Sequence, residues 1–287
     1  MKNALTVDLE DYFHVTAFGD RVGAQEWAGR ASRVEANTAK ILQQLSETRQ
    51  QATFFVLGWV AEKHPRLIRE IAGLGHEIAC HSLRHRLVHQ MSPEEFRDDT
   101  RRAKELLEDA GGNPVRGYRA PSFSINRDSL WALEILAELG FRYDSSIFPV
   151  RHISYGMPDG PRFLFRVDTR FGPILEFPMT TLQLARTRSP IAGGAYLRLL
   201  PYWYTRWGMR YLNTQERRPV CVYVHPWELD PDQPRVGARL SARLRHYLGL
   251  RSMGRKLHRL LRDFEFCSLG SLIEELQADT PPPVENV

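Results

Sequence analysis

Cysteine is scarce in this chain of 287 residues. The three cysteines, Cys80, Cys221 and Cys267, are far apart in the sequence and have mainly apolar neighbours. An odd number of widely spaced cysteines is not the pattern of a disulfide framework or of a zinc knuckle. We therefore expect reduced core thiols and a protein that matures in a reducing compartment.

Long hydrophobic runs are also missing. No stretch approaches the length of a membrane span, and the first apolar run is interrupted by Asp8, Glu10 and Asp11. A secretory signal peptide would instead have a basic head followed by an uninterrupted apolar segment. The expected location is therefore the cytoplasm, with attachment to the surface of the inner membrane as the alternative.

Acidic residues are absent from the segment between Arg235 and Arg262, although the net charge of the whole chain is only +5. Such a charge run is either the solvated outside of helices or a surface that attracts anions. We predict a peripheral membrane or anionic-polymer contact through Arg239–Arg262, and we do not expect nucleic acid as the partner. The basic residues concerned are Arg239, Arg243, Arg245, Arg251, Arg255, Lys256, Arg259 and Arg262.

What the sequence does have is a regular alternation of strand and helix patterns, with a hydrophobic content of 43% that is enough for one sizeable core. Strands separated by helices of this length pair in parallel through right-handed crossovers. We therefore predict an α/β sheet or barrel with its active site at the carboxyl ends of the strands. Beyond the run at Leu5, strand patterns cover 52–57, 76–80, 115–119, 141–144 and 220–224, and helix patterns cover 34–45, 65–74, 93–110 and 128–139.

The alternation breaks between residues 145 and 219, where prolines separate short β-like runs and an aromatic-rich stretch. We interpret this part as an insertion. The predicted organisation is one domain over residues 1–278, with a core at 1–150 and 220–275 and an insertion at about 145–219. Residues 279–287 are expected to form a flexible tail.

Polar side chains follow the predicted strands where these end. Asp8, Glu10 and Asp11 follow the first strand, and three acids this close repel one another unless a cation or a catalytic task offsets the repulsion. His81 and His85 follow another strand, and we expect His85 one helical turn beyond His81. Two histidines at this spacing suit a divalent metal, although an isolated pair is also common on solvated helix faces.

Arg119, Asp144 and His225 end three further strands, so all these side chains are expected at one rim of the sheet. Two imidazoles, several carboxylates, an arginine and a lone histidine are the inventory for metal-assisted hydrolysis. The alternative interpretations are a purely structural pairing of Arg119 with an acid and a His225 that only ends its strand.

The sequence resembles the polysaccharide deacetylases of carbohydrate esterase family four, whose catalytic core is the chitooligosaccharide-deacetylase homology domain. The motifs that carry the resemblance stand in the family's order, at Thr6–Asp11, His81–His85, Arg119–Pro121 and Val222–His225. Finer features resemble the branch found in exopolysaccharide loci alongside exosortase sorting systems, and they lie at residues 8–13, 176–178, 192–196, 199–202 and 225–228.

This resemblance implies a distorted (β/α) barrel of the polysaccharide deacetylase type with an inserted β- and aromatic-rich segment. It also implies metal-dependent hydrolysis of N-acetyl groups from an amino-sugar-containing exopolysaccharide or its lipid-linked precursor, so that the partner is an acetylated amino-sugar polymer or oligomer. Zinc is the expected metal, and cobalt, nickel, manganese and iron suit the same ligands. The alternatives are an amidohydrolase acting on a non-sugar amide and a catalytically inactive carbohydrate-binding protein.

The resemblance also implies roles for the residues that follow the strands. His81 and His85 are expected to bind the metal. The third ligand is open, because the common family pattern has two adjacent aspartates whereas Leu9 follows Asp8 here. Glu10, which shares a strand face with Asp8, is preferred, and Asp11 is the alternative.

The remaining roles implied by the resemblance concern catalysis. Asp8 is expected to be the base, oriented by Arg119, and His225 is expected to be the general acid. The backbone N–H of Ser122 is the implied donor to the oxyanion. Two further expectations come from position: Trp227 as a sugar-stacking surface beside His225, and Asp144 as a supporting partner of Arg119 or His225.

Overall fold

A computed structural model describes residues 1–18, 22–152, 156–185, 187–191, 193–237 and 239–285. Ala192 of the predicted 192–196 motif, residues 153–155 of the predicted insertion and residues 286–287 of the predicted tail lie outside the described residues.

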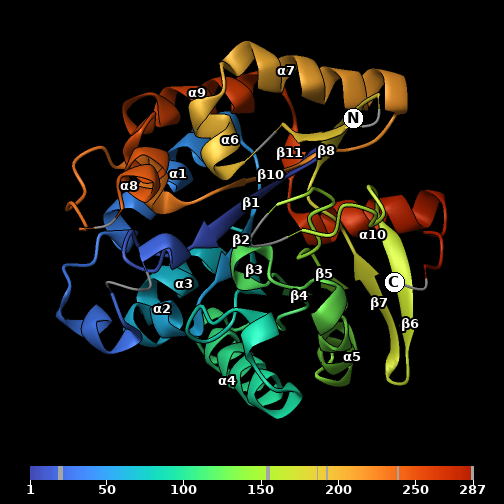
Figure 1. The fold of residues 1–287 in the computed structure, drawn as a ribbon, viewed down its shortest axis with the longest axis horizontal. Coiled ribbons are helices and arrows are strands. Elements are labelled where there is room, and N and C mark those ends of the chain that lie inside the picture. Colours follow the sequence, from blue (N-terminus) through green and yellow to red (C-terminus); the bar gives the residue numbers. More distant parts are fainter. Residues whose placement is uncertain (19–21, 153–155, 186, 192, 238, 286–287) are drawn as a thin grey trace.

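A mainly parallel sheet forms the centre of the molecule (Figure 1). Its strand order is β10-β1-β2-β3-β4-β5-β7-β6, with β11 also paired to β1, and every pair is parallel except β6 with β7. The predicted α/β class is therefore confirmed. The strand bounds are β1 Asn3–Leu9, β2 Thr53–Val56, β3 Glu77–Cys80, β4 Gly117–Tyr118, β5 Tyr143–Asp144, β6 Phe165–Thr169, β7 Gly172–Glu176, β8 Thr181–Leu184, β9 Thr187–Pro190, β10 Cys221–Val224 and β11 Phe266–Cys267.

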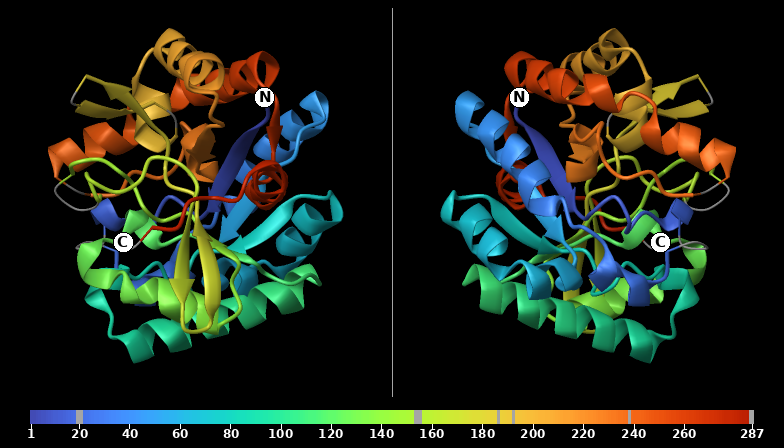
Figure 2. Two further views of the ribbon diagram at one scale, coloured as in Figure 1. Left: turned by 90° about the vertical axis from the view of Figure 1, so that its right-hand side faces the viewer. Right: turned by 90° about the vertical axis from the view of Figure 1, so that its left-hand side faces the viewer.

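Helices connect the strands and cover the sheet from outside (Figures 1 and 2). The α-helices are α1 Val34–Thr48, α2 Gly58–Lys63, α3 Pro65–Gly73, α4 Pro93–Gly111, α5 Trp131–Glu138, α6 Gly194–Leu199, α7 Tyr202–Tyr211, α8 Leu240–Tyr247, α9 Leu250–Asp263 and α10 Leu269–Asp279. Short 3-10 turns are η1 Thr16–Phe18, η2 Ala24–Gly29, η3 Val88–Gln90, η4 Pro121–Phe123, η5 Arg127–Ser129 and η7 Pro226–Leu229, and η6 Leu212–Glu216 is a π turn.

Helix α4 shows how local sequence sets these boundaries. Ser92 accepts a hydrogen bond from the backbone N–H of Glu95 (3.2 Å), and the Glu95 carboxylate accepts one from the N–H of Ser92 (2.9 Å). This reciprocal cap satisfies two donors that the first turn leaves free. At the other end Gly112 adopts a left-handed conformation (φ 71°), which costs a glycine little.

The strands divide their side chains between two layers, because successive side chains of a strand point to opposite faces. In β1, Leu5, Val7 and Leu9 belong to the core under the helices, whereas Ala4 faces the opposite, inner side. Helix α10 contributes Leu269, Leu272 and Ile273 to the same inner cluster as Ala4. Apolar side chains thus fill the inner side near the start of β1, and polar side chains follow toward its carboxyl end.

The segment predicted as an insertion is only partly separate from the core. Strand β7 pairs in parallel with β5 and extends the central sheet, whereas β8 and β9 form a hairpin of their own. The short strands were too proline-rich for the sequence pattern to assign them to the main sheet. The insertion boundaries remain a proposal, and β7 belongs to the central sheet.

Residues 283–285 of the predicted flexible tail pair with β6. The N–H of Arg166 donates to Pro283 O (2.8 Å), and the N–H of Glu285 donates to Arg166 O (2.9 Å). Strand β6 lies at the edge of the sheet, so its outer backbone groups need partners that no further strand supplies. Among the described residues, no helix is long and apolar enough to cross a membrane.

Candidate active site

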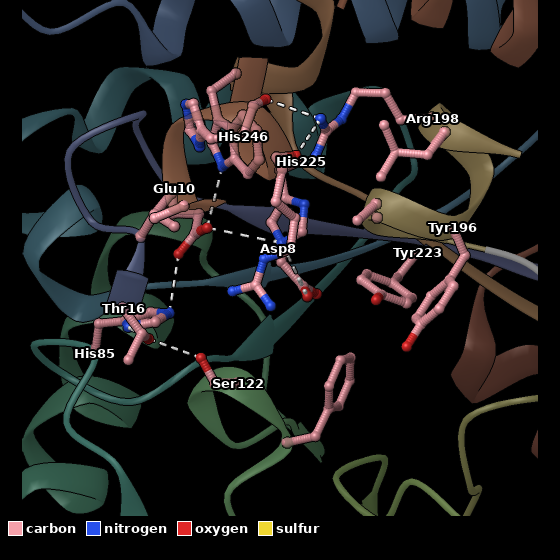
Figure 3. A pocket seen from close by; sticks show the side chains of 18 of the residues that line it. Asp8, Glu10, Thr16, His85, Ser122, Tyr196, Arg198, Tyr223, His225 and His246 are labelled. Atoms are coloured by element: carbon pink, nitrogen blue, oxygen red, sulfur yellow. Dashed lines mark hydrogen bonds and ion pairs between the residues drawn. The ribbon is translucent and has the colours of Figure 1, made fainter. Parts of the chain in front are cut away.

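A cavity of about 470 Å³ opens at the carboxyl ends of the strands (Figure 3). The loops after β1, β3 and β10 contribute its polar wall, and α6 and α8 contribute much of the opposite wall. The residues that line it are Asp8, Glu10, Val15, Thr16, His81, His85, Ser122, Phe123, His152, Gly194, Ala195, Tyr196, Arg198, Leu199, Leu200, Tyr223, His225, Trp227, Ala242, Arg245 and His246.

Three potential metal ligands, Glu10, His81 and His85, meet on the polar wall, with one ligand atom of each within 4.8 Å of the others. His81 follows β3 and donates its Nδ1–H to Arg119 O (2.8 Å), which leaves Nε2 free to face the other two residues. Burial lowers the pKa of His81 to about 4, so this imidazole is neutral at neutral pH. A neutral imidazole fixed in one tautomer by a backbone carbonyl is the usual form of a metal-binding histidine.

His85 reaches the cluster from a loop and not from the helical turn expected from its spacing. Both Ser82 (φ 67°) and His85 (φ 53°) have left-handed backbones, and the N–H of His85 donates to the Ser82 hydroxyl (3.0 Å). The sequence Ser82–His85 thus forms a tight turn that brings His85 Nε2 to 3.0 Å from Glu10 Oε2. The two histidines lie near each other, as predicted, but the helical turn expected between them was wrong. Their role as metal ligands stays a prediction.

The three side chains fit a divalent cation of the zinc type. Glu10 is 3% exposed, and apart from its contact with His85 Nε2 its Oε2 has no polar partner among the described residues. Burial would raise the pKa of Glu10, but the neighbouring His85, His225 and His81 lower it, so this buried carboxylate is ionised. Two imidazole nitrogens and one carboxylate oxygen match the ligand set of a catalytic zinc site.

Asp11, the alternative third ligand, lies outside this cluster. Its Oδ2 accepts hydrogen bonds from Ser32 Oγ (2.8 Å) and from the backbone N–H groups of Arg33 (2.7 Å) and Val34 (3.2 Å). It therefore caps the start of α1, where a carboxylate is stabilised by the helix dipole and the free N–H groups. The geometry favours Glu10 as the ligand and gives Asp11 a structural contact.

Beside the cluster, Asp8 forms an ion pair with the fully buried Arg119. Arg119 Nη1 donates to Asp8 Oδ1 (2.8 Å) and to Thr6 Oγ1 (2.7 Å), and its other nitrogens donate to Ser145 O (3.1 Å) and Ser145 Oγ (3.0 Å). Burial alone would lower the pKa of Arg119, but the charge of Asp8 raises it above its ordinary value. One carboxylate oxygen of Asp8 is thereby fixed by a permanent cation, and Oδ2 lies toward the cavity, 3.9 Å from His225 Nε2.

His225 follows β10 and is held by Glu228, a residue to which the sequence motifs gave no role. Glu228 Oε2 lies 3.2 Å from His225 Nδ1 and also accepts the His225 backbone N–H (3.0 Å). Burial would lower the pKa of His225, but Glu228, Glu10 and Asp8 raise it to about 9. The sequence pattern could have indicated this role of Glu228. A proline directly after His225 and an acid three residues after it are typical of a helix start with a reciprocal cap.

The other oxygen of Glu228 anchors α6. Arg198 Nε donates to Glu228 Oε1 (3.0 Å), and Arg198 Nη1 donates to the carbonyls of Arg245, His246 and Leu248 (2.8 Å each). Arg198 is 3% exposed, so this is a buried ion pair. The wall formed by α6 and α8 is thus linked through Glu228 to His225. Figure 3 shows Arg198 and His225 on this side of the cavity.

Asp144 was expected to support Arg119 or His225, and it contacts neither through a described hydrogen bond. It accepts a hydrogen bond from Ser146 Oγ (2.6 Å) and is hydrogen-bonded to Glu176. Burial raises the pKa of Asp144, and burial with the charge of Asp144 raises the pKa of Glu176 well above its ordinary value. We interpret the two acids as sharing one proton, while Ser145 and Glu228 take the supporting positions.

Trp227 and Ser122 both line the cavity, but Trp227 does not present an open ring. It is 5% exposed, its ring stacks on those of His225 (5.0 Å) and His246 (4.2 Å), and its Nε1 donates to Glu10 Oε1 (3.1 Å). It therefore orients a potential metal ligand instead of offering a sugar-stacking face. Ser122 has a left-handed backbone (φ 51°), and its hydroxyl lies 2.7 Å from that of Thr16 at the cavity edge.

Two family models match the chain, and together they cover most of it. Residues 28–143 match the family described as polysaccharide deacetylase, and residues 145–274 match a domain of unknown function, DUF3473. The division falls close to the predicted start of the insertion.

Two curated relatives each resemble about a third of the chain. A peptidoglycan-N-acetylglucosamine deacetylase from Bacillus cereus is 35% identical over 98 residues, which is 34% of this chain and 36% of that protein. A chitooligosaccharide deacetylase from Bradyrhizobium is 32% identical over 101 residues, which is 35% of this chain and 43% of that protein. The matches thus span about two fifths or less of these relatives.

Solved structures resemble the whole fold at low sequence identity. A crystal structure described as a polysaccharide deacetylase from Mycobacterium smegmatis is 20% identical with a TM-score of 0.63, and it covers 100% of this chain and 95% of that one. The structure of Puue allantoinase is 16% identical with a TM-score of 0.62, covering 97% of this chain and 90% of that one. At these identities the likeness concerns the fold.

Proposed function

Because residues 28–143 match the polysaccharide deacetylase family, we propose that this chain belongs to that family and is a hydrolase that removes N-acetyl groups from an amino-sugar polymer or oligomer. The single observation that carries the proposal is that one cavity is lined by the Glu10, His81 and His85 cluster together with Asp8 and His225, which are held from behind by Arg119 and Glu228.

Asp8 is proposed as the base that accepts a proton from the attacking water. Its Oδ1 is bonded to Arg119, so the carboxylate is oriented and stays paired with a cation, and its Oδ2 remains directed to the cavity. A base in this position raises the rate only if it lies within hydrogen-bond reach of the water when substrate is bound.

His225 is proposed as the acid that donates a proton to the departing amine. With a pKa of about 9 in the metal-free protein, its imidazole is protonated at neutral pH and has a proton to give. Nδ1 faces Glu228, so Nε2 is the nitrogen that faces the cavity. The His225 Nε2 to Asp8 Oδ2 distance of 3.9 Å puts acid and base on the same side of the cluster.

Glu10, His81 and His85 are proposed to hold a divalent metal, with zinc preferred and cobalt, nickel, manganese or iron also compatible with the ligands. When bound, the ion would act as a Lewis acid toward the acetyl carbonyl oxygen and lower the pKa of a water molecule. The backbone N–H of Ser122 is proposed as a second donor to the carbonyl oxygen as it becomes negative.

For the substrate, we propose an amino-sugar-containing exopolysaccharide or its lipid-linked precursor, and a cytoplasmic protein that contacts an anionic surface through Arg239–Arg262. The apolar part of the cavity, which includes Tyr196, Leu199 and Leu200, supports a substrate that is not uniformly polar. We also propose that residues 1–278 form one domain, in which the segment 145–219 is an insertion into a barrel.

A substrate panel tests the reaction class. Zinc-loaded protein is incubated with N-acetylated chitooligosaccharides, N-acetylated polysaccharide and small linear and cyclic amides, and acetate, free amine and ring opening are measured. Acetate and glucosamine-type amines released only from the sugars would support the proposal. Turnover of small amides without turnover of any sugar would overturn it, as would tight sugar binding without turnover in the metal-loaded protein.

A further inference from the structure

Helix α8 presents its leucines to solvent and its histidine to the interior. Leu240 is 68% exposed and Leu244 is 48% exposed, whereas His246 is 3% exposed. Leu248, directly after the helix, is 52% exposed and continues the same spacing of four residues. A helix at the surface of a water-soluble protein normally has the reverse arrangement, in which the apolar side chains face the core.

The neighbouring helix α9 shows that ordinary arrangement. It buries Leu250, Met253, Leu257, Leu260 and Leu261, and its exposed positions include Arg251 and Arg255. The two helices come from one continuous segment of the chain, so composition does not account for the exposed leucines of α8. The apolar face of α8 has no partner among the described residues.

The packing of α8 fixes this orientation. His246 is held inside by its contact with Gln233 Oε1 (2.7 Å) and by stacking on Trp227. Arg198 of α6 donates to three carbonyl groups at the carboxyl end of α8, so the last turn cannot rotate without breaking a buried cation's hydrogen bonds. Because these buried contacts fix the orientation of α8, its leucines stay exposed to solvent.

Unpaired cations surround the leucines. Arg239, Arg243 and Arg251 are exposed, and no ion pair links them to an acid in the described parts of the chain. Exposed leucines next to unpaired arginines are the composition of a helix that lies in the interface of an anionic bilayer, with leucines in the acyl boundary and arginines at the headgroups. An acidic polysaccharide would be attracted to the arginines but would not bury the leucines.

The helix that carries the exposed leucines also forms part of the cavity wall. Ala242 and Arg245 of α8 line the cavity, and Leu199 of α6 both lines it and is 45% exposed. Figures 1 and 2 show α6, α8 and α9 together at one end of the molecule, away from α4 and α5. A protein attached through α8 would therefore hold its cavity close to the membrane surface.

We propose that α8 with Leu248 is an anionic-membrane anchor that inserts Leu240, Leu244 and Leu248 into the interface of the bilayer. The orientation favours a substrate held at that surface by a lipid, and this part of the inference rests on the proposed deacetylase function. The anchor itself does not, because it is inferred from the exposed side chains of α8 and their charge.

Vesicle flotation tests the anchor with the full chain and two sets of substitutions. One variant carries Leu240→Ser, Leu244→Ser and Leu248→Ser, and the other carries Arg239→Gln, Arg243→Gln and Arg251→Gln. Matched controls elsewhere on the surface are Leu74→Ser with Phe171→Ser, both exposed apolar residues, and Arg66→Gln, Arg69→Gln and Arg102→Gln. The vesicles are phosphatidylcholine alone or mixed with phosphatidylglycerol.

We expect the wild type and both controls to float with phosphatidylglycerol vesicles and to bind phosphatidylcholine alone much more weakly. Each arginine removed should weaken binding by about fivefold, and the leucine variant should lose binding even at low salt. If the wild type does not bind, or if the leucine variant binds as the wild type does while the arginine variant is weak, the membrane anchor is wrong. The second result would identify an electrostatic contact with an acidic polymer.

Acetate release from a soluble N-acetylated oligosaccharide separates this proposal from the deacetylase proposal. None of the substituted leucines lines the cavity, so the leucine variant should match the wild type on a soluble substrate. Vesicle binding without any acetate release would leave the anchor standing and refute the proposed reaction. Acetate release without vesicle binding would support the proposed reaction and refute the anchor.

Discussion

Replacing Glu228 with glutamine should lower the pKa of the His225 imidazole in the metal-free protein. Burial alone lowers this pKa, and Glu228 is the largest of the influences that raise it to about 9 from an ordinary value of 6.5. The difference corresponds to about 3 kcal/mol at about 1.4 kcal/mol for each unit of pKa. Since Glu10 and Asp8 also raise the pKa and burial lowers it, that figure is the net result of all these influences and not the contribution of Glu228 alone.

The imidazole can be titrated directly by NMR in chelated wild type, Glu228→Gln and Glu228→Asp protein. We expect His225 to be protonated at pH 8 in the wild type, largely neutral in Glu228→Gln, and intermediate in Glu228→Asp, which keeps the charge. A His225 pKa that is unchanged in Glu228→Gln would refute the reasoning.

The same substitution should change how stability depends on pH. A pKa that is raised by folding contributes stability that is fully present below pH 6.5 and is lost as the pH rises through about 9. Urea denaturation of the chelated protein should therefore show a loss between these pH values that is smaller in Glu228→Gln. In the metal-loaded enzyme, the alkaline limb of the kcat/KM profile should move to lower pH.

Three other substitutions have distinct expected results. Asp8→Asn should lower kcat by about 10²–10⁴-fold with metal content unchanged, because Asp8 is not part of the Glu10, His81 and His85 cluster; loss of metal would contradict its role as base. Trp227→Phe removes the N–H that Glu10 Oε1 accepts, so metal affinity measured by calorimetry should fall by about 10–100-fold, and an unchanged affinity would argue against Glu10 as a ligand. Arg119→Met leaves the carboxylate of Asp8 buried without its cation, so urea denaturation should show a loss of about 3–5 kcal/mol; a wild-type midpoint would show that the pair is not needed for stability.

The features predicted best from the sequence are those that depend only on the direction of the strands. Asp8, His81, Arg119 and His225 all lie at or just beyond the ends of parallel strands, and the carboxyl ends of parallel strands meet at one edge. No knowledge of distant contacts was needed to predict that Asp8, His81 and His225 line one cavity and that Arg119 lies beside them. The same argument placed Glu10 on the face of Asp8, because side chains two apart in a strand share a face.

Features that the sequence could not predict depend on contacts between distant segments and on loop conformation. Asp11 is a structural residue because it accepts hydrogen bonds from the start of α1, and its partners there are more than twenty residues away in the sequence. Arg198 reaches Glu228 from a segment that had no clear pattern, and the turn at His85 depends on left-handed backbone angles. Trp227 was identified as a site residue from its neighbour His225, but its burial between two imidazoles could be known only from the structure.

The most direct test of the central claim, a metal-dependent deacetylase site built from Glu10, His81 and His85, is acetate release before and after metal replacement. The protein is stripped with a chelator, assayed on an N-acetylated chitooligosaccharide, reloaded with zinc or cobalt and assayed again beside His81→Ala and Asp8→Asn. We expect release that disappears on chelation, returns with the metal, is lost in His81→Ala and is lowered about 10²–10⁴-fold in Asp8→Asn, which should still bind metal. Release that survives chelation, or that His81→Ala retains, would contradict that claim.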